Sequence, residues 1–577
     1  MHLESLIEDI GSFGRYQRCI VCVLAVCKGL TVAPMMTMAF AGLEPDWWCE
    51  SRDQDDVAIF TNGSYQNCQW NGTCQRIFES ETVTIVSEWS LVCSKRWISN
   101  TIISIQMAGV LLGSVIAGYC ADRYGRKKVV YGGLVLSTIS NIIAAFSVSW
   151  VMFAVIRVII GTSVGMTLSC SFLYQMEFVG KKWRGVCAAI PSWSLGMVLF
   201  ATFTWTTRNW KWLHLTIAAF SIPLLLTWFV MPESLRWLAV KGHLEEARRV
   251  ANRIARYNKR PVPDTSILEL IAQEEKAEGD KAKSYTYIDL VRTRALRWRT
   301  VITLFIWFSL SVVYYAISFG VRNLSGDFYL NLMIMGLLEL PMALVQLFMV
   351  SVFSRRWACA LLFVLSAVTC FGVAMVTKLA PEDIKVPLEN GFAISAKLFS
   401  ISAWLLVLAL SSEQFPTVVR NLAVAAQNIV ARIGGIFAAQ IFSLGPKNDL
   451  MPPFVAMGIL MTLTALSCFS LEETSKMALE DTMKKYTIEV STEEVKETLL
   501  PKANTLTVNG SVGAKGDSPE MEEDGADTIP CGDDDERGGI CQSKVKIIVE
   551  MVDNNVPEKD EEEEPRSTTF IKPEQAS

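Results

Sequence analysis

Apolar runs of about 20 residues recur along most of the chain, each long enough to cross about 30 Å of hydrocarbon as an α-helix. The runs lack the period-two alternation of a membrane β-barrel, so helices are the way for the backbone to satisfy its hydrogen bonds in lipid. The pattern therefore predicts an all-α integral membrane protein with twelve spans. The predicted spans are residues 18–41, 98–120, 129–148, 150–172, 186–206, 213–231, 300–319, 329–351, 358–377, 390–410, 420–443 and 452–471.

The long polar segments divide these spans into two sets of six. Residues 239–297 are charged and favour helix, so short amphipathic helices and a solvated linker are both compatible with them. Residues from about 475 onward carry acidic blocks and too few apolar residues to offset the ordering entropy, which predicts disorder. The predicted domains are a first half at 1–238 with an outer loop at 43–97, a cytoplasmic insert at 239–297, a second half at 298–474 and an acidic cytoplasmic tail at 475–577.

Composition adds little until it is divided by region. The 577 residues are 51% hydrophobic with a mean hydropathy of +0.31, because the insert and the tail dilute the spans. The net charge of −5 is equally uninformative, since acidic residues gather in the tail and basic residues in short loops. No basic patch with interleaved aromatic residues indicates nucleic-acid binding. No cleavable signal sequence is recognisable, so we expect the first span to act as the signal anchor.

Charge in the short loops predicts the orientation. The loop after the second span is basic, as is the loop with Lys181, Lys182 and Arg184 after the fourth, and the positive-inside rule makes both cytoplasmic. The loop at 43–97 is then extracellular, and both termini are cytoplasmic. This loop contains glycosylation sequons at Asn62 and Asn71. It also contains four cysteines, compatible with up to two disulfides of undetermined connectivity: Cys49, Cys68, Cys74 and Cys93.

The segment from Gly118 to Lys127 is the most specific motif, reading Gly-Tyr-Cys-Ala-Asp-Arg-Tyr-Gly-Arg-Lys. Gly118 and Gly125 are expected to permit close helix approach and a tight turn. Asp122 is expected to pair with a cation and to accept hydrogen bonds from a helix N-terminus, a contact that would latch the halves in one state. The alternative is an ordinary basic loop.

Further segments occur in order at predicted helix ends, namely Ser87–Cys93, Arg157–Gly165, Glu177–Arg184, Pro232–Leu238, Glu413–Arg420 and Leu471–Thr474. Together they resemble solute carrier family 22 of the major facilitator superfamily, closest to its organic cation and carnitine branch. The resemblance covers nearly all of residues 10–480. It implies a twelve-helix transporter in two halves and a set of residues that gate conformational change: Gly118, Asp122, Arg123, Gly125, Arg126, Glu177, Arg184, Glu233, Arg236, Glu413 and Arg420.

The resemblance also implies substrate-binding residues of both charges. Glu339 stands where cation and carnitine carriers have a glutamate, which indicates a cation contact, a coupling-ion site or a structural ion pair. Arg432 stands where carnitine-type and anion carriers have an arginine, which indicates a carboxylate anchor or, again, a structural pair. Lys397 matches a lysine typical of the tenth helix. Lys28 has no recognised counterpart and either contacts substrate or snorkels to the interface.

Aromatic residues complete the expected site. Tyr314, Tyr315 and Trp307 resemble aromatic positions of the family, where ring faces attract quaternary ammonium groups, although ordinary packing is the alternative. Two departures weaken the inference of substrate. Ser351–Arg356 keeps a basic pair but lacks the acidic and glycine residues of the repeated loop motif. Leu408 and Leu410 replace tyrosines of carnitine-type carriers.

These features predict a plasma-membrane transporter of small organic ions that works by alternating access, with organic cations or carnitine-like zwitterions as cargo. Organic anions are the alternative cargo, and a non-transporting receptor or regulator is the alternative class. We expect no enzymatic activity, ATP use, cofactor or metal, since phosphate-binding glycine loops, nucleophile elbows and ligand clusters are lacking in the sequence. Sodium or proton coupling is compatible with the sequence. The lipid bilayer is a required partner, and cytoplasmic regulators are expected partners of the tail.

Overall fold

The structure is a computed structural model that describes residues 2–52, 58–59, 68, 75–79, 81–264, 266–270, 286–445 and 449–474. Twelve helical regions in this part of the chain are long and apolar enough to cross a membrane, which confirms the predicted number of spans. Each predicted span falls within or closely over one of them. The tail lies outside the described residues, as do both sequons and Cys74.

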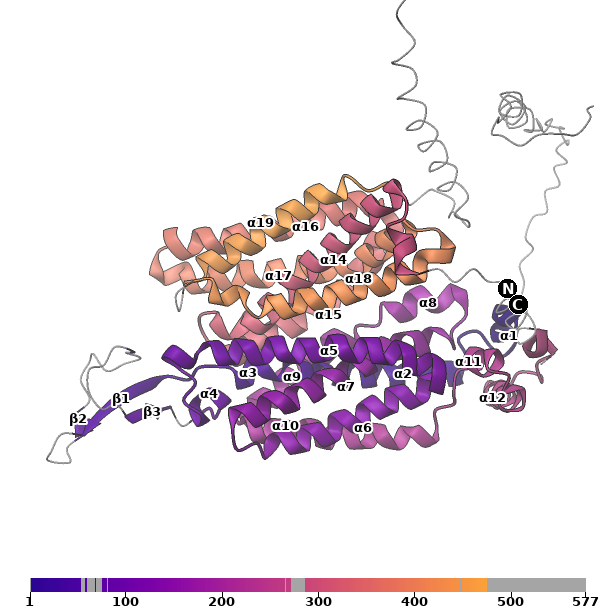
Figure 1. Ribbon diagram of the computed structural model, residues 1–577, viewed down its shortest axis with the longest axis horizontal. Coiled ribbons are helices and arrows are strands. Elements are labelled where there is room, and N and C mark those ends of the chain that lie inside the picture. Colours follow the sequence, from indigo (N-terminus) through magenta and orange to yellow (C-terminus); the bar gives the residue numbers. More distant parts are fainter. Residues whose placement is uncertain are drawn as a thin grey trace, which may run out of the picture. The chain divides into compact units, whose positions relative to one another are not determined.

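The first half contains spans one to six (Figure 1). A short helix precedes them, the first span is divided into α2 and α3, and α8 leads into the fifth span. The elements are α1 (His2–Asp9), α2 (Arg15–Leu30), α3 (Val32–Ala41), α5 (Trp97–Tyr124), α6 (Arg126–Ala145), α7 (Trp150–Met176), α8 (Lys181–Ala188), α9 (Ser192–Thr207), α10 (Trp210–Leu226) and η2 (Thr227–Phe229).

The second half contains spans seven to twelve, and the elements are α14 (Arg294–Gly320), η4 (Val321–Asn323), α15 (Phe328–Val352), α16 (Arg355–Leu379), α17 (Glu382–Glu413), α18 (Thr417–Ala438), η5 (Ile441–Ser443) and α19 (Met451–Cys468). Helix α5 of the first half packs against α18, and α9 packs against α15. Between the halves lie α11 (Leu235–Val240), α12 (Leu244–Tyr257) and η3 (Tyr287–Leu290). The described part of the insert is thus helical rather than a plain linker, and α12 buries Ala247, Val250, Ala251 and Ile254.

The loop at 43–97 has more regular structure than its polar composition indicates. Strands β1 (Trp47–Arg52), β2 (Ala58–Ile59) and β3 (Gln75–Phe78) form an antiparallel sheet in the order β2-β1-β3, with Trp47 opposite Phe78 and Ser51 opposite Ile59. The helical turns α4 (Ile85–Glu88) and η1 (Cys93–Lys95) follow. Cys68 and Cys93 form a disulfide, which ties the loop to the start of α5. The side chain of Cys49 lies outside the described residues.

The first span breaks at Thr31, between α2 and α3. Pro34 has no N–H and therefore interrupts the helical hydrogen-bond ladder at this point. Buried polar side chains from two other helices bond to carbonyls just after the break: Gln106 Nε2 donates to Met35 O at 2.8 Å and Arg157 Nη1 donates to Pro34 O at 3.1 Å. The break is therefore held by α5 and α7.

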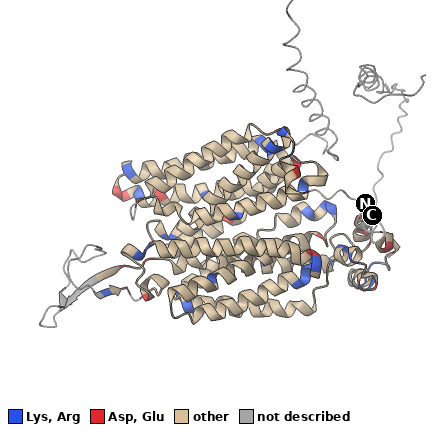
Figure 2. Cartoon of the chain, in the orientation of Figure 1, with Lys and Arg blue, Asp and Glu red and all other residues tan. Residues whose placement is uncertain are grey.

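Glycines set the closest helix contact of the first half. A Cβ on Gly109 or Gly113 of α5 would collide with the backbone of α7, and one on Gly161 or Gly165 would collide with α5. Both pairs have the small-xxx-small spacing that lets membrane helices approach closely. Charged side chains are instead concentrated at the helix ends, with few between them (Figure 2).

Candidate functional site

A buried ion pair joins two helices of the second half near their middle. Lys397 Nζ on α17 lies 2.8 Å from Glu339 Oε1 on α15, and the two side chains are 1% and 0% exposed. A lone charge at membrane depth is costly, whereas a pair is largely neutral. This explains how the tenth span continues through Lys397. The second carboxylate oxygen, Glu339 Oε2, is buried without a hydrogen-bond partner.

Aromatic rings surround this pair. Lys397 Nζ lies 5.6 Å from the centre of the Tyr314 ring, and Tyr314 Oη donates a long hydrogen bond of 3.5 Å to Glu339 Oε1. Trp193 Nε1 on α9 donates to Tyr314 Oη at 2.5 Å, which connects the two halves. Trp404 on α17 packs edge-on against Tyr314 and Trp307, with centroid distances of 5.9 and 5.5 Å. Trp307 and Tyr314 are buried, whereas Trp193 and Trp404 keep part of their surface exposed.

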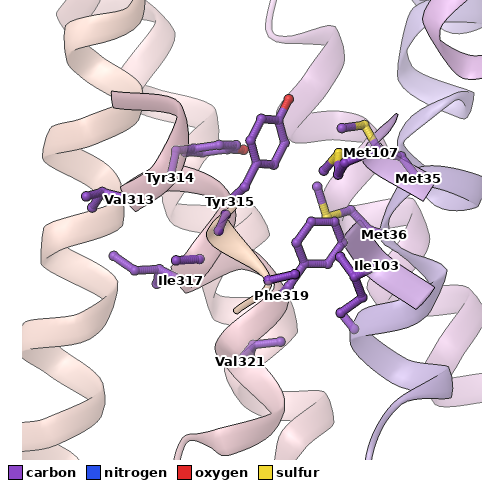
Figure 3. Close-up of a cluster of buried hydrophobic side chains, with 14 of the residues drawn as sticks. Met35, Met36, Ile103, Met107, Val313, Tyr314, Tyr315, Ile317, Phe319 and Val321 are labelled. Atoms are coloured by element: carbon purple, nitrogen blue, oxygen red, sulfur yellow. The ribbon is translucent and has the colours of Figure 1, made fainter. Parts of the chain in front are cut away.

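Arg432 lies on α18 and is connected to this cluster through Tyr315, whose ring centre lies 5.3 Å from that of Tyr314. Its Nη1 donates to Tyr315 Oη at 3.1 Å, and no acidic side chain of the described residues forms an ion pair with it. Figure 3 shows Tyr315 and Phe319 of α14 next to Met35, Met36 and Met107 of the first half. Arg432 as a residue is partly exposed. Arg432 is therefore a partly accessible cation whose charge has no carboxylate partner in the described part of the chain.

Lys28 on α2 is likewise partly exposed and forms no ion pair with any described residue. Its Nζ lies 6.0 Å from the centre of the Phe172 ring on α7. The sequence-predicted residues thus separate into two groups. Glu339, Lys397, Tyr314 and Trp307 form one cluster, whereas no hydrogen bond, ion pair or ring contact among the described residues joins Lys28 to it.

The halves meet by hydrogen bonds at one end of the bundle, the end that carries the 43–97 loop, which we call the outer end. Arg322 Nη1 donates to Gly42 O at 2.9 Å and to Ser99 Oγ at 2.8 Å. Asn100 Nδ2 donates to Ser443 Oγ at 2.7 Å. In the described residues, the hydrogen bonds between α2–α10 and α14–α19 lie at this end or near the Trp193–Tyr314 contact. The outer end is therefore closed.

The opposite, inner end of the first half is organised by Glu233. Its Oε1 accepts from the backbone N–H groups of Arg126, Lys127 and Ser234 at 2.9, 3.1 and 3.0 Å. Burial raises the pKa of Glu233, and these N–H donors and the charge of Arg126 oppose that shift. Gly125 has φ +107°, and a Cβ there would collide with the Glu233 carboxylate. A carboxylate at the start of α6 also complements the helix dipole.

Two predictions for the Gly118–Lys127 motif are corrected. Asp122 does not accept from the start of α6, because Glu233 occupies that position. Asp122 is 77% exposed and pairs with Arg126 at 3.1 Å, within its own half. A Cβ on Gly118 would meet no atom within 4 Å, so the close approach predicted there is absent in this conformation. Arg126 also pairs with Glu177 of the α7 end at 3.3 Å.

The second half repeats this arrangement despite its altered loop sequence. Glu473 accepts from the N–H groups of Arg355 and Arg356 at 3.0 and 3.1 Å, as Glu233 does at the start of α6. Arg355 pairs with Glu413 of the α17 end at 2.9 Å, as Arg126 does with Glu177. The acidic residue missing from Ser351–Arg356 is thus not needed for the geometry.

The remaining predicted gating residues have local partners or none. Arg123 donates to Tyr119 Oη at 2.8 Å, and Arg184 pairs with Glu4 of α1 at 3.1 Å. Arg420 Nε donates to Ser412 O at 3.0 Å and so caps the end of α17. Arg236 is exposed.

Sequence reasoning missed Trp193 and Trp404. A signal for Trp404 was present, because it follows Lys397 by seven residues and therefore lies on the same face of the helix. Trp193 has a weaker signal, its position between two serines of an apolar span.

Comparison with known proteins shows the family to which the chain belongs. Residues 61–486 match the family model of the sugar (and other) transporters. The chain is 30% identical to the organic cation transporter protein of Drosophila melanogaster over 84% of this chain and 94% of that protein. It is 28% identical to the human organic cation/carnitine transporter 2 over 79% of both chains. It is 31% identical to solute carrier family 22 member 7 of Bos taurus over 69% of this chain and 72% of that protein.

Solved structures show the same fold at lower identity. The inward-open xylose transporter XylE from E. coli superposes with a TM-score of 0.58 and 17% identity, covering 82% of this chain and all of that protein. This similarity shows the major facilitator fold alone.

Proposed function

Because the chain belongs to solute carrier family 22, within the sugar (and other) transporters of the major facilitator superfamily, we propose that it carries small organic ions that bear a carboxylate across the plasma membrane. Carnitine-like zwitterions are the cargo that the charges favour best. The relatives named for organic cations and carnitine support this substrate class.

The observation that carries the proposal is the difference between a buried charge, Glu339, and a partly exposed charge, Arg432. Glu339 is neutralised by Lys397, so it leaves little net charge for a cation. Arg432 is partly exposed without a carboxylate partner in the described residues, and a guanidinium binds a carboxylate with two parallel hydrogen bonds. Exposed surface on Trp193 and Trp404 offers ring faces to a quaternary ammonium group.

Transport follows from the two ends of the bundle. In this conformation the outer contacts of Arg322 and Asn100 hold the halves together. Rocking of one half against the other about the Trp193–Tyr314 contact would break these outer contacts and close the inner end. The inner-end networks of Glu233 and Glu473 would keep each half rigid during that motion.

Orientation belongs to the same proposal. The basic loops at Arg126 and Arg184 indicate that the inner end faces the cytoplasm. Both termini would then face the cytoplasm as well. The 43–97 loop would then be extracellular, in agreement with its disulfide between Cys68 and Cys93. We further propose that the acidic tail binds cytoplasmic regulators and that transport needs no catalysis by the chain.

Uptake by cells that express the protein tests the proposal. Carnitine, a simple organic cation and a dicarboxylate should be compared for the wild type, Arg432→Ala and Arg432→Lys, with surface protein measured by biotinylation. We expect Arg432→Ala to abolish uptake of carboxylate substrates at unchanged surface expression. Arg432→Lys keeps the charge without the bidentate fork and should raise KM with partial activity. Unchanged carboxylate uptake in Arg432→Ala would contradict the assignment.

Organic anions are a second candidate cargo, favoured by one further observation. Lys28 adds another partly exposed cation with no acidic partner in the described residues. Preference for the dicarboxylate over carnitine, lost in Lys28→Met, would support this candidate. Surface-expressed protein without flux for any of the three ions would instead indicate a non-transporting receptor.

A further inference from the structure

The outer end of the second half contains a buried carboxylate that the proposed transport site does not use. Glu389 on α17 is 2% exposed, and no lysine, arginine or histidine of the described residues forms an ion pair with it. Lys385, one turn earlier, is paired with Glu382 at 3.1 Å instead. The hydrogen bond that Glu389 accepts in the described part of the chain is a long one of 3.5 Å from Ser325 Oγ. Burial of a carboxylate with so little compensation is unfavourable.

Neutral oxygens from three chain segments gather beside Glu389. Asn390 Nδ2 donates to Ser325 O at 2.7 Å and to Asn331 Oδ1 at 3.2 Å, and Asn331 Nδ2 donates to Ser325 O at 3.0 Å. Ser325 thus contacts both Glu389 and the two asparagines. Asn390 Oδ1 is buried and accepts no hydrogen bond. The Asn390 amide oxygen and the Glu389 carboxylate, on adjacent residues, could therefore both bind a cation.

The donor set selects the kind of cation. Carboxylate, amide, hydroxyl and carbonyl oxygens are hard ligands, which suit alkali and alkaline-earth ions rather than transition metals. Divalent ions are normally held with more negative charge than one carboxylate provides. The described residues contain no group of three or more His, Cys, Asp or Glu side chains that could hold a metal ion. A single charge is therefore matched best by a single positive charge.

We propose that Glu389, Ser325, Asn331 and Asn390 form a binding site for a small monovalent cation, sodium, at the outer end of the second half. The site lies between α17, α15 and the segment that joins η4 to α15. Sodium supplies the positive charge that Glu389 lacks, and the free Asn390 oxygen can serve as one of its ligands.

The position of this site links it to the central ion pair. Asn331 precedes Glu339 on α15 by eight residues, and Glu389 precedes Lys397 on α17 by the same number. Eight residues of helix span about 12 Å and slightly more than two turns, so each outer residue and its inner counterpart share a helix face. Sodium that fixes α15 against α17 therefore favours one spacing of the Glu339–Lys397 pair. This coupling rests on the proposed transport function, whereas the binding itself does not.

Thermal unfolding of the purified full-length protein tests binding without any organic substrate. The midpoint should be measured in sodium, potassium and N-methyl-D-glucamine chloride at equal ionic strength. A cation that binds only the folded state raises the midpoint by mass action. We expect sodium to raise it in the wild type, and we expect the rise to be lost in Glu389→Gln and to need more sodium in Asn390→Ala. Asp383→Asn, a change at an exposed carboxylate of the same helix that has no ion pair among the described residues, should keep the rise.

Equal midpoints in the three salts, or a sodium-dependent rise that survives in Glu389→Gln, would overturn the site. If Glu389→Gln does not fold, the sodium titration of Asn390→Ala decides, and an unchanged titration would equally overturn it. Uptake in sodium and in N-methyl-D-glucamine separates the two proposals. A sodium-dependent midpoint in protein that transports none of the tested ions supports the site and contradicts the transport function. Sodium-independent uptake with equal midpoints supports the transport function and contradicts the sodium site.

Discussion

The buried cations Arg157 and Lys397 and the partly buried Arg322 each have a different acceptor. Arg157 donates to Pro34 O and contacts His214, and Arg322 is held by Gly42 O, Ser99 and Asn100. Lys397 has the carboxylate of Glu339. Most donors of these residues are already occupied, with Arg157 Nε as the buried exception, so we regard the three residues as structural in this conformation. Arg432, with a tyrosine hydroxyl as its acceptor, is the contrasting case, which is why a substrate carboxylate is assigned to it.

Removing one member of the Glu339–Lys397 pair should destabilise the protein by about 3–5 kcal/mol, because the other charge stays buried and uncompensated. We expect Glu339→Gln and Lys397→Met each to lower the thermal unfolding midpoint. The double variant, which buries no charge, should recover most of that loss. Unfolding followed by intrinsic fluorescence in detergent measures the cycle. Additive losses in the double variant would contradict the pairing.

Transport by the same three variants separates two roles for the pair. If Glu339 and Lys397 only stabilise helix packing, the double variant should recover uptake together with stability. A double variant that folds and reaches the surface without transporting would place the pair in the transport cycle.

Among the helices, the spans could be predicted from sequence because hydrocarbon thickness fixes their length and hydropathy. Lys397 interrupts the tenth span, and the continuity of that span depends on a partner, Glu339, that lies on another helix. The rotation of each helix about its axis could not be predicted. That rotation decides that Trp193 meets Tyr314. Glu233 lies in the non-helical segment before α11, so no helical pattern predicts that it, and not Asp122, lies at the start of α6.

Close contact between α5 and α7 depends on glycine. A Cβ on Gly113 would collide with the backbone of Thr162, so Gly113→Ala should separate the helices and lower the unfolding midpoint. Gly132→Ala on α6 is the matched control, because a Cβ there meets no atom within 4 Å. The control should be neutral or stabilising by about 0.4–1 kcal/mol through lower unfolded-state entropy. Equal midpoints for the two variants would argue against the tight interface.

At the scale of the whole molecule, the closed outer end predicts that a disulfide placed across it blocks uptake reversibly. Asn100 and Ser443 belong to different halves and contact each other directly. We expect Asn100→Cys with Ser443→Cys to form a disulfide under oxidation that prevents the outer end from opening and abolishes uptake. Reduction should restore it, and each single variant should be insensitive to oxidant. A crosslinked double variant that still transports would show that the halves do not separate there.

The internal repeat belongs to this scale as well. The second-half loop departs from the motif in sequence, because it keeps the basic pair but lacks the acidic and glycine residues. The structure keeps the contacts although the motif differs. Glu473 accepts from the start of α16 as Glu233 does from the start of α6. Glu413 pairs with Arg355 as Glu177 pairs with Arg126. Both acidic residues lie far along the chain from the loop, so a local reading of that loop could not have revealed them.

Asn258, just after α12, contacts the amino-terminal segment of the first half. Its Nδ2 donates to Ile10 O and Gln17 Oε1 at 2.8 and 2.7 Å, and its Oδ1 accepts from Tyr16 N at 3.0 Å. These partners leave the ribosome some 240 residues before it does. The hydrogen bonds of Asn258 to the amino-terminal segment can therefore form only after the insert has been translated. Biogenesis of the first half thus ends at α12 rather than at its sixth span.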